Sequence, residues 1–198
     1  MLESLKPWYA RLLGPLAKVL IKTCIHPNAI TLAGLCFSPI AAFLTTRGQW
    51  FLAALCIGLG ALMDGLDGLV ARQTGKKTTW GAILDSTVDR ITEIIWFVGL
   101  LVFYSKVENG IFGIFFTYCA MSGSLMVSYV RARSEGAHVP CTSGLAQRPE
   151  RIIILIGGLL AGPAIMTWGL LGLSAVSYFT VFQRLVETYR YCKKQTER

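Results

Sequence analysis

The sequence predicts an all-α integral membrane protein, in which six transmembrane helices follow one amphipathic helix at the membrane interface. Hydrophobic residues make up 54% of the chain and charged residues 15%, and the mean hydropathy is +0.54. Such values are typical of chains that cross a bilayer several times, each time with about 20 apolar residues. The stretches long enough to do so lie at residues 30–46, 50–70, 79–104, 111–130, 152–167 and 168–188.

These stretches leave no room for a separate soluble domain, so we expect residues 1–198 to form a single membrane domain. Residues 1–22 would form the interfacial helix and residues 23–198 the six-helix bundle. The boundary between the last two stretches falls somewhere between Gly162 and Gly172.

Near the N-terminus, apolar residues recur at helical spacing with basic residues between them, which is typical of a helix in the membrane interface. Pro7 and Pro15 interrupt the apolar core that a signal peptide would need. A partly disordered leader is the alternative. The apolar residues are Leu5, Trp8, Tyr9, Leu12, Leu16 and Leu20.

Basic residues are distributed unequally between the two sides of the predicted membrane topology. With a cytoplasmic N-terminus, the loops on the opposite side carry only Arg47 and Lys106. This asymmetry predicts a multi-pass cell-membrane protein with both termini in the cytoplasm, and it explains the net charge of +8 without nucleic acid. The cytoplasmic set includes Lys6, Arg11, Lys18, Lys22, Arg72, Lys76, Lys77, Arg131, Arg133, Arg148, Arg151, Arg190, Lys193 and Lys194.

Four aspartates lie within 26 residues, and the segments on either side of them are otherwise apolar: Asp64, Asp67, Asp85 and Asp89. Residues 49–63 before them carry no charge. A charged side chain inside a membrane costs several kcal/mol unless a partner compensates it. Four carboxylates together therefore predict a cation site.

The spacing of the aspartates predicts how they meet. Asp64 and Asp67 are three residues apart, and Asp85 and Asp89 are four apart, so each pair lies on one face of a helix. The polar residues 73–79 between the pairs predict a turn on the cytoplasmic side. We expect two neighbouring antiparallel helices whose carboxylates, and hence the active site, face the cytoplasm.

Carboxylates without histidine or cysteine favour a hard cation, either Mg²⁺ or Mn²⁺. One ion would leave excess negative charge, so two ions are plausible, and a pair of metals suits in-line displacement at phosphorus. Arg72 lies one turn beyond Asp67 and offers a planar fork for phosphate. Gly68 and Gly81 leave space for a ligand to approach the backbone.

Two other interpretations of the aspartates fit the sequence less well. In a buried ion-pair network, Arg72 and Arg90 would have to balance four aspartates and Glu93, which they cannot do. A divalent-cation transporter would place its carboxylates near the membrane midplane or along a pore, whereas these gather near one end of their helices.

The string from Asp64 to Asp89 reads D-x-x-D-G-x-x-A-R, eight residues, then G-x-x-x-D-x-x-x-D. It resembles the signature of the CDP-alcohol phosphatidyltransferase family and matches every fixed position of it. The six predicted transmembrane helices, the interfacial helix and the chain length also resemble this family, so the resemblance covers nearly the whole chain.

The resemblance implies that an acceptor hydroxyl attacks the lipid-side phosphorus of a CDP-linked lipid and that CMP leaves. It implies metal binding by Asp64, Asp67 and Asp85, with Asp89 sharing a second metal and acting as general base. It also implies a homodimer, which Gly158 and Gly162 could support by close helix packing. The positions similar to the family's CDP-lipid site are Pro27, Asn28, Ala29, Ile30, Gly68, Arg72 and Thr78.

For Asn28, an N-cap of the first transmembrane helix is as good an interpretation as ligand contact, and both could hold.

Four arginines in a predicted cytoplasmic region indicate the acceptor. Arg131, Arg133, Arg148 and Arg151 fall within 21 residues, and bound metal already balances the carboxylates. These arginines therefore need another anion, which a phosphorylated polyol would supply. The alternative is that they only set the topology or contact anionic lipid headgroups.

The residues around these arginines, 128–135 and 147–151, are similar to the subgroup of the family that uses inositol phosphate. Arg131 and Ser134 depart from that subgroup, where lysine and alanine are usual. We therefore predict transfer to inositol phosphate. Glycerol 3-phosphate, free inositol and serine remain open as acceptors.

Overall fold

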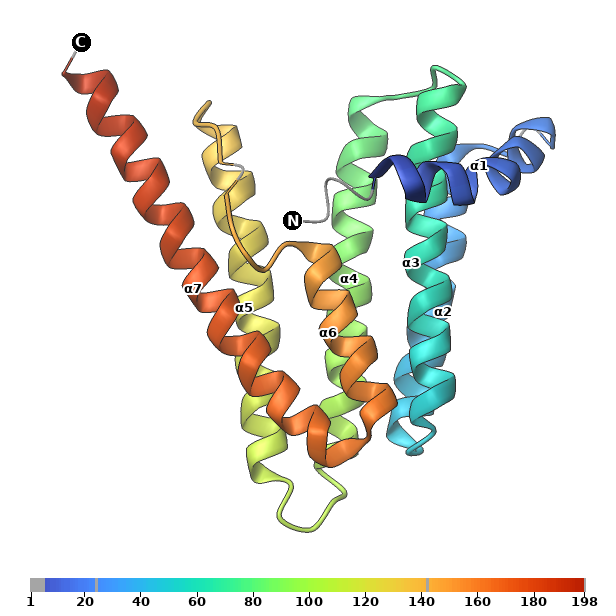
Figure 1. Ribbon diagram of the computed structural model, residues 1–198, viewed down its shortest axis with the longest axis vertical. Helices are drawn as coiled ribbons and strands as arrows, with labels where there is room; N and C mark the ends of the chain where they lie inside the picture. Colours follow the sequence, from blue (N-terminus) through green and yellow to red (C-terminus); the bar gives the residue numbers. More distant parts are fainter. Residues whose placement is uncertain (1–5, 24, 142, 198) are drawn as a thin grey trace. The chain divides into compact units, whose positions relative to one another are not determined.

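The computed structural model describes residues 6–23, 25–141 and 143–197, and their regular secondary structure is entirely helical (Figure 1). The prediction of an all-α protein is confirmed for these residues, while residues 1–5 of the predicted interfacial helix lie outside them. The helices are α1 (Lys6–Lys22), α2 (Pro27–Thr46), α3 (Trp50–Gln73), α4 (Thr79–Tyr104), α5 (Ile111–Gly136), α6 (Arg148–Ala161) and α7 (Pro163–Thr196).

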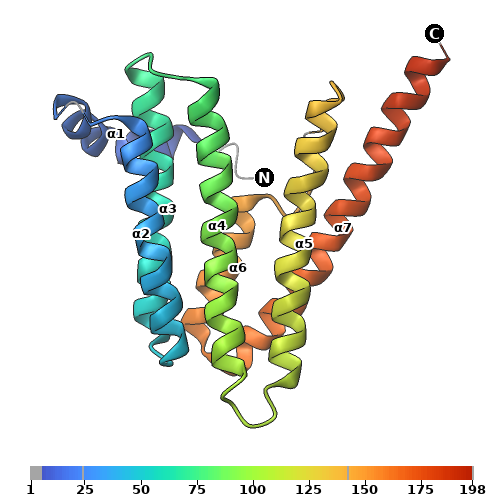
Figure 2. The ribbon, with the colours of Figure 1, turned by 180° about the vertical axis from the view of Figure 1, so that it is seen from behind.

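The chain divides into two compact units, residues 1–99 and 100–198, with the division inside α4. In the first unit, α2 and α3 run antiparallel, and α1 lies across one end of the pair (Figures 1 and 2). The apolar core at this end holds residues from all three helices: Leu13, Ala17, Ile30, Leu66, Leu69 and Val70.

Helix α1 has apolar residues on two faces. Leu13 and Ala17 are buried in the core, whereas Leu16, one of the residues in the predicted apolar stripe, is 46% exposed. Leu20, another residue of the stripe, is half-buried and packs against the same core. Of the two stripe residues whose side chains the structure describes, Leu16 is therefore the one available to a membrane surface.

Small residues allow the helices of the first unit to approach closely. A Cβ atom on Gly34 of α2 would lie 3.2 Å from the Met63 Cβ of α3. A Cβ on Gly99 of α4 would lie 2.7 Å from the Ala42 Cα of α2, too close for the backbone to tolerate. These contacts hold α3 and α4 against α2, which fixes where their aspartates lie.

In the second unit, α7 packs against both α5 and α6. The loop between α5 and α6, described at residues 137–141 and 143–147, runs back beside α5 (Figure 1), and its backbone is hydrogen-bonded to side chains of α7. The Ala146 N–H donates to the Thr180 hydroxyl at 3.0 Å, and Arg184 Nε donates to the Ser143 carbonyl at 2.9 Å. Gly144 has φ +134°, a conformation that side-chain-bearing residues rarely adopt.

Four described helices are long and apolar enough to cross a bilayer: α2, α3, α5 and α7. Large apolar side chains such as Phe51, Phe112 and Trp168 are exposed on them, as expected for surfaces that face lipid. The chain is therefore a multi-pass membrane protein. Helix α4 has 26 residues but carries four charges, and α6 has only 14 residues.

The boundary between the last two stretches lies at the first residue of the predicted range from Gly162 to Gly172, a few residues before the stretch limits at 167 and 168. Helix α6 ends at Ala161, Gly162 has φ +92°, and Pro163 begins α7. A glycine in this conformation followed by a proline stops one helix and starts the next. The hydrophobicity of residues 164–172 hides this break from a reading of apolar length alone.

Candidate functional site

Three of the four predicted metal-binding aspartates come together in the first unit. One carboxylate oxygen from each of Asp64, Asp67 and Asp85 lies within 4.8 Å of the other two. Asp64 and Asp67 lie one turn apart on α3, and Asp85 lies in the first half of α4. Asp67 is buried, with 5% of its surface exposed, and the other two are half-buried.

The donor set fits a hard divalent cation. Oxygen ligands of a single Mg²⁺ lie at most about 4.2 Å apart, because each bond is about 2.1 Å long. The three carboxylates are therefore within a small side-chain movement of a common ligand sphere. Carboxylate oxygens are also the ligands that Mg²⁺ and Mn²⁺ prefer.

Thr31 is a site residue that the sequence analysis missed. Its hydroxyl donates to Asp67 Oδ2 across the helix pair and also lies 3.3 Å from the Pro27 carbonyl. This contact orients the buried carboxylate towards the other two. The available signal was its position one turn after Asn28, on the same face of α2.

Asp89 is not among the three clustered carboxylates. It lies one turn after Asp85 on α4, is 8% exposed, and its Oδ2 is 3.4 Å from Arg90 Nη1. Arg90 is itself held by the Ser86 carbonyl, to which it donates at 2.8 Å. The roles of Asp89 as second-metal ligand and general base remain predictions.

The start of α2 meets the start of α4 beside the aspartates. Pro27 is the first residue of α2, and the N-cap is His26, whose Nδ1 accepts from the Asn28 N–H at 3.3 Å. The interpretation of Asn28 as the N-cap is therefore wrong. The Asn28 side chain instead faces α4, where its Oδ1 would lie 3.3 Å from a Cβ on Gly81.

Thr78 closes the other side of this junction. Its hydroxyl accepts from the Gly81 N–H at 2.9 Å, so Thr78 caps the first turn of α4. A Cβ on Gly81 would lie 3.0 Å from the same hydroxyl, which explains why glycine fits here. Asn28, Thr78 and Gly81 thus form one polar corner.

The remaining predicted CDP-lipid residues differ in their surroundings. The Arg72 guanidinium lies over Gly68, with Nη1 3.5 Å from where a Cβ would be. Ala29 is exposed, whereas the Ile30 side chain is buried in the core with α1. Their predicted contact with lipid remains a prediction.

The four predicted acceptor arginines lie in the second unit and divide into buried and exposed groups. Arg151 is 2% exposed and donates to the Ala146 carbonyl at 3.0 Å. Arg148 is half-buried as the first residue of α6. Arg131 and Arg133 are exposed at the end of α5, and Arg131 Nε donates to Glu135 at 2.8 Å.

A fifth arginine, Arg184 on α7, was not predicted as a site residue. It is 3% exposed and donates to the carbonyls of Ser143 and Val127. Arg131 and Arg151 lie within electrostatic range of it, so three cations from three helices gather here. Its hydrogen-bond partners Ser143 and Val127 lie 41 and 57 residues away in the sequence, so only packing shows them.

The fold and the carboxylate cluster together define a multi-pass membrane protein with a site for a divalent cation. The family model described as CDP-alcohol phosphatidyltransferase matches residues 24–182. The chain belongs to this family. It is therefore a transferase of phospholipid biosynthesis, and this membership excludes the transporter alternative.

Two relatives in this family are named as synthases of inositol phosphate lipids. An archaetidylinositol phosphate synthase from Methanothermobacter thermautotrophicus is 34% identical over 98% of this chain and 96% of its own length. A phosphatidylinositol phosphate synthase from Corynebacterium glutamicum is 38% identical over 87% of this chain and 81% of its own.

The solved phosphatidylinositol phosphate synthase of Mycobacterium tuberculosis, with CDP-DAG bound, superimposes with a TM-score of 0.84 at 30% identity. The match covers 90% of this chain and 94% of that one. A second structure of the same protein holds manganese and citrate.

Proposed function

We propose that the protein transfers a phosphatidyl-type group from a CDP-linked lipid to inositol phosphate and releases CMP. The product is a phosphoinositol lipid that keeps the terminal phosphate. The observation that carries this proposal is similarity over most of the chain to relatives named as phosphatidylinositol or archaetidylinositol phosphate synthases. The cluster of arginines in the second unit supports a phosphorylated acceptor.

In this proposal, Asp64, Asp67 and Asp85 hold the divalent cation, and the Thr31 hydroxyl orients Asp67. The metal, Mg²⁺ or Mn²⁺ and two ions in the complete site, would neutralise charge on the transferring phosphate. Asp89 accepts the proton of the acceptor hydroxyl as that oxygen forms its bond to the lipid-side phosphorus. The bond from this phosphorus to the CMP oxygen breaks, and CMP departs.

The polar corner of Asn28 and Thr78, with Pro27, Ala29 and Ile30 beside it on α2, would receive the cytidine end of the donor. Gly81 leaves the space between the two side chains open. Arg72, lying over Gly68, offers two nitrogens to a phosphate oxygen pair.

The acceptor phosphate would bind among Arg131, Arg133, Arg148 and Arg151, with Arg184 as a fifth cation. Arg184 and Arg151 each donate a hydrogen bond to a backbone carbonyl of the loop, which fixes the orientation of their side chains. The exposed Arg131 is held by Glu135 and can exchange that carboxylate for phosphate.

We further propose that α2 to α7 all cross the membrane, that α1 lies at the interface, and that site and termini face the cytoplasm. Helix α6 is about 21 Å long and the hydrocarbon about 30 Å thick. The loop of residues 137–147 would cover the difference, because its backbone is bonded to protein side chains. The proposal takes the chain as one domain that forms a homodimer.

The test is CMP release by the purified protein with CDP-diacylglycerol and Mg²⁺, offering inositol 1-phosphate, inositol, glycerol 3-phosphate and serine one at a time. We expect turnover with inositol 1-phosphate alone. Turnover only with another alcohol would overturn the acceptor and keep the transferase chemistry.

The variant Arg131→Ala tests the phosphate contact. We expect a higher KM for inositol phosphate, by about tenfold, with kcat largely kept, because a charge-assisted bond contributes roughly 1.5–3 kcal/mol. The matched control is Arg47→Ala, an exposed arginine of the first unit that stacks on Phe43. An unchanged KM in Arg131→Ala would limit that residue to setting the topology.

A further inference from the structure

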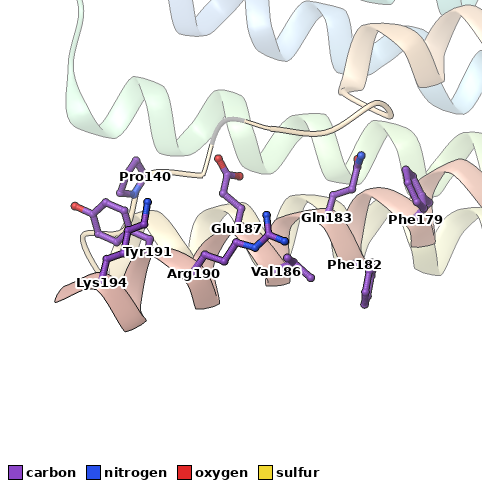
Figure 3. A pocket seen from close by; sticks show the side chains of 9 residues that line it. All are labelled: Pro140, Phe179, Phe182, Gln183, Val186, Glu187, Arg190, Tyr191 and Lys194. Atoms are coloured by element: carbon purple, nitrogen blue, oxygen red, sulfur yellow. The ribbon is translucent and has the colours of Figure 1, made fainter. Parts of the chain in front are cut away.

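A groove of about 490 Å³ runs along the second half of α7, between this helix and the loop that follows α5 (Figure 3). Phe179, Phe182 and Val186 line it towards one end, and Arg190 and Lys194 line it towards the other (Figure 3). The groove therefore changes from apolar to basic along one helix. None of its lining residues has a role in the proposed reaction.

In the proposed topology, the groove lies where α7 leaves the hydrocarbon. The helix has 34 residues and a length of about 51 Å, well above the bilayer's hydrocarbon thickness of about 30 Å. About 20 residues counted from Pro163 cross that thickness, which ends the buried part near Phe182. Arg190 and Lys194 then stand at the depth of the lipid headgroups, and Tyr191 beside them is typical of that depth.

The charges in the groove suit a single phosphate. Arg190 and Lys194 are both exposed and lie one turn apart on α7. Glu187 is the one carboxylate among the nine lining residues, and it accepts a hydrogen bond from the Ser143 hydroxyl at the loop edge. The basic end thus keeps a net positive charge directed at the groove.

We propose that this groove binds one anionic phospholipid of the surrounding leaflet. Its phosphate would lie between Arg190 and Lys194, and an acyl chain would follow Val186, Phe182 and Phe179 into the hydrocarbon. The order of basic and apolar side chains matches the order of headgroup and chain in such a lipid. The site is independent of the proposed acceptor and is tested by binding, without turnover.

The first test is titration of the purified full-length protein in neutral detergent with phosphatidylglycerol or phosphatidylcholine, with bound lipid counted by native mass spectrometry. We expect tighter binding of phosphatidylglycerol and an affinity about fivefold weaker in Lys194→Gln. Lys193→Gln is the matched control, because Lys193 is the neighbouring residue, pairs with Glu197 and does not line the groove. Equal losses in the two variants would overturn the proposal.

A second substitution tests the apolar end of the groove. Phe182→Ser should weaken retention of phosphatidylglycerol, whereas Phe115→Ser, an equally exposed phenylalanine of α5 outside the groove, should not. Equal affinity for phosphatidylglycerol and phosphatidylcholine would overturn the assignment of the basic end to an anionic headgroup.

Discussion

At the scale of single residues, the buried Asp89 is the side chain whose role matters most. Replacement by asparagine keeps its shape and removes its basicity, so Asp89→Asn should lower kcat by at least about 100-fold. Binding of the CDP-linked lipid should persist. CMP release and lipid binding are measured separately, with the thermal unfolding midpoint as the check on folding. Turnover near that of the wild type would contradict the general-base role.

Thr31 should act through Asp67. Thr31→Val keeps the volume and removes the donated hydrogen bond, so the concentration of Mn²⁺ needed for half-maximal activity should rise by about 10-fold or more. Thr31→Ser keeps the hydroxyl and serves as the control. If Thr31→Val and Thr31→Ser require the same Mn²⁺ concentration, the hydrogen bond does not support the metal site.

The sequence and the structure agree most closely at this scale for the aspartates. Asp64, Asp67 and Asp85 were predictable because charge in an apolar segment is rare and because helical spacing sets their direction. Thr31 was not, since its partner Asp67 lies 36 residues away and threonine is common in apolar helices. The same holds for Arg184, whose partners come from other segments.

At the scale of the helices, the contact between α4 and α2 at Gly99 leaves no room for a side chain. Gly99→Ala would place its Cβ 2.7 Å from the Ala42 Cα and 2.9 Å from the Ala42 carbonyl oxygen. We expect a loss of about 1–3 kcal/mol in stability, because backbone cannot move aside as a flexible side chain can. Thermal unfolding in detergent micelles measures the change.

Gly58→Ala is the control for this substitution. It lies inside α3 with no atom within 4 Å of a new Cβ, so it should be neutral or slightly stabilising. Equal unfolding midpoints for Gly99→Ala and Gly58→Ala would mean that the helices can separate locally without cost.

The helix boundaries show how well the length of apolar stretches predicts where helices begin and end. Apolar length predicted α2, α3 and α5 closely, because their ends fall at polar loops. It left the boundary between α6 and α7 as a range, because apolar residues continue on both sides of Gly162 and Pro163. It also started α6 too late, at residue 152, because the first turn of this helix holds the charged residues Arg148, Glu150 and Arg151.

At the scale of the whole molecule, we predict that α4 crosses the membrane although it carries four charged residues. Cysteines introduced as Lys77→Cys and Glu108→Cys flank this helix in a background without the native cysteines. We expect a membrane-impermeant thiol reagent to label position 108 from outside intact cells and position 77 only in inverted vesicles. Labelling of both from the same side would contradict the six-helix topology.

The loop between α5 and α6 also bears on how the protein is made. Its backbone is bonded to Thr180 and Arg184, which the ribosome adds more than 30 residues later. Until α7 has entered the membrane, the Ser143 carbonyl and the Ala146 N–H lack these partners, which is costly if the loop lies at membrane depth, as in the proposed topology. Insertion of α7 is therefore the event that completes this half of the protein, and nascent chains that stop before it should be substrates for membrane quality control.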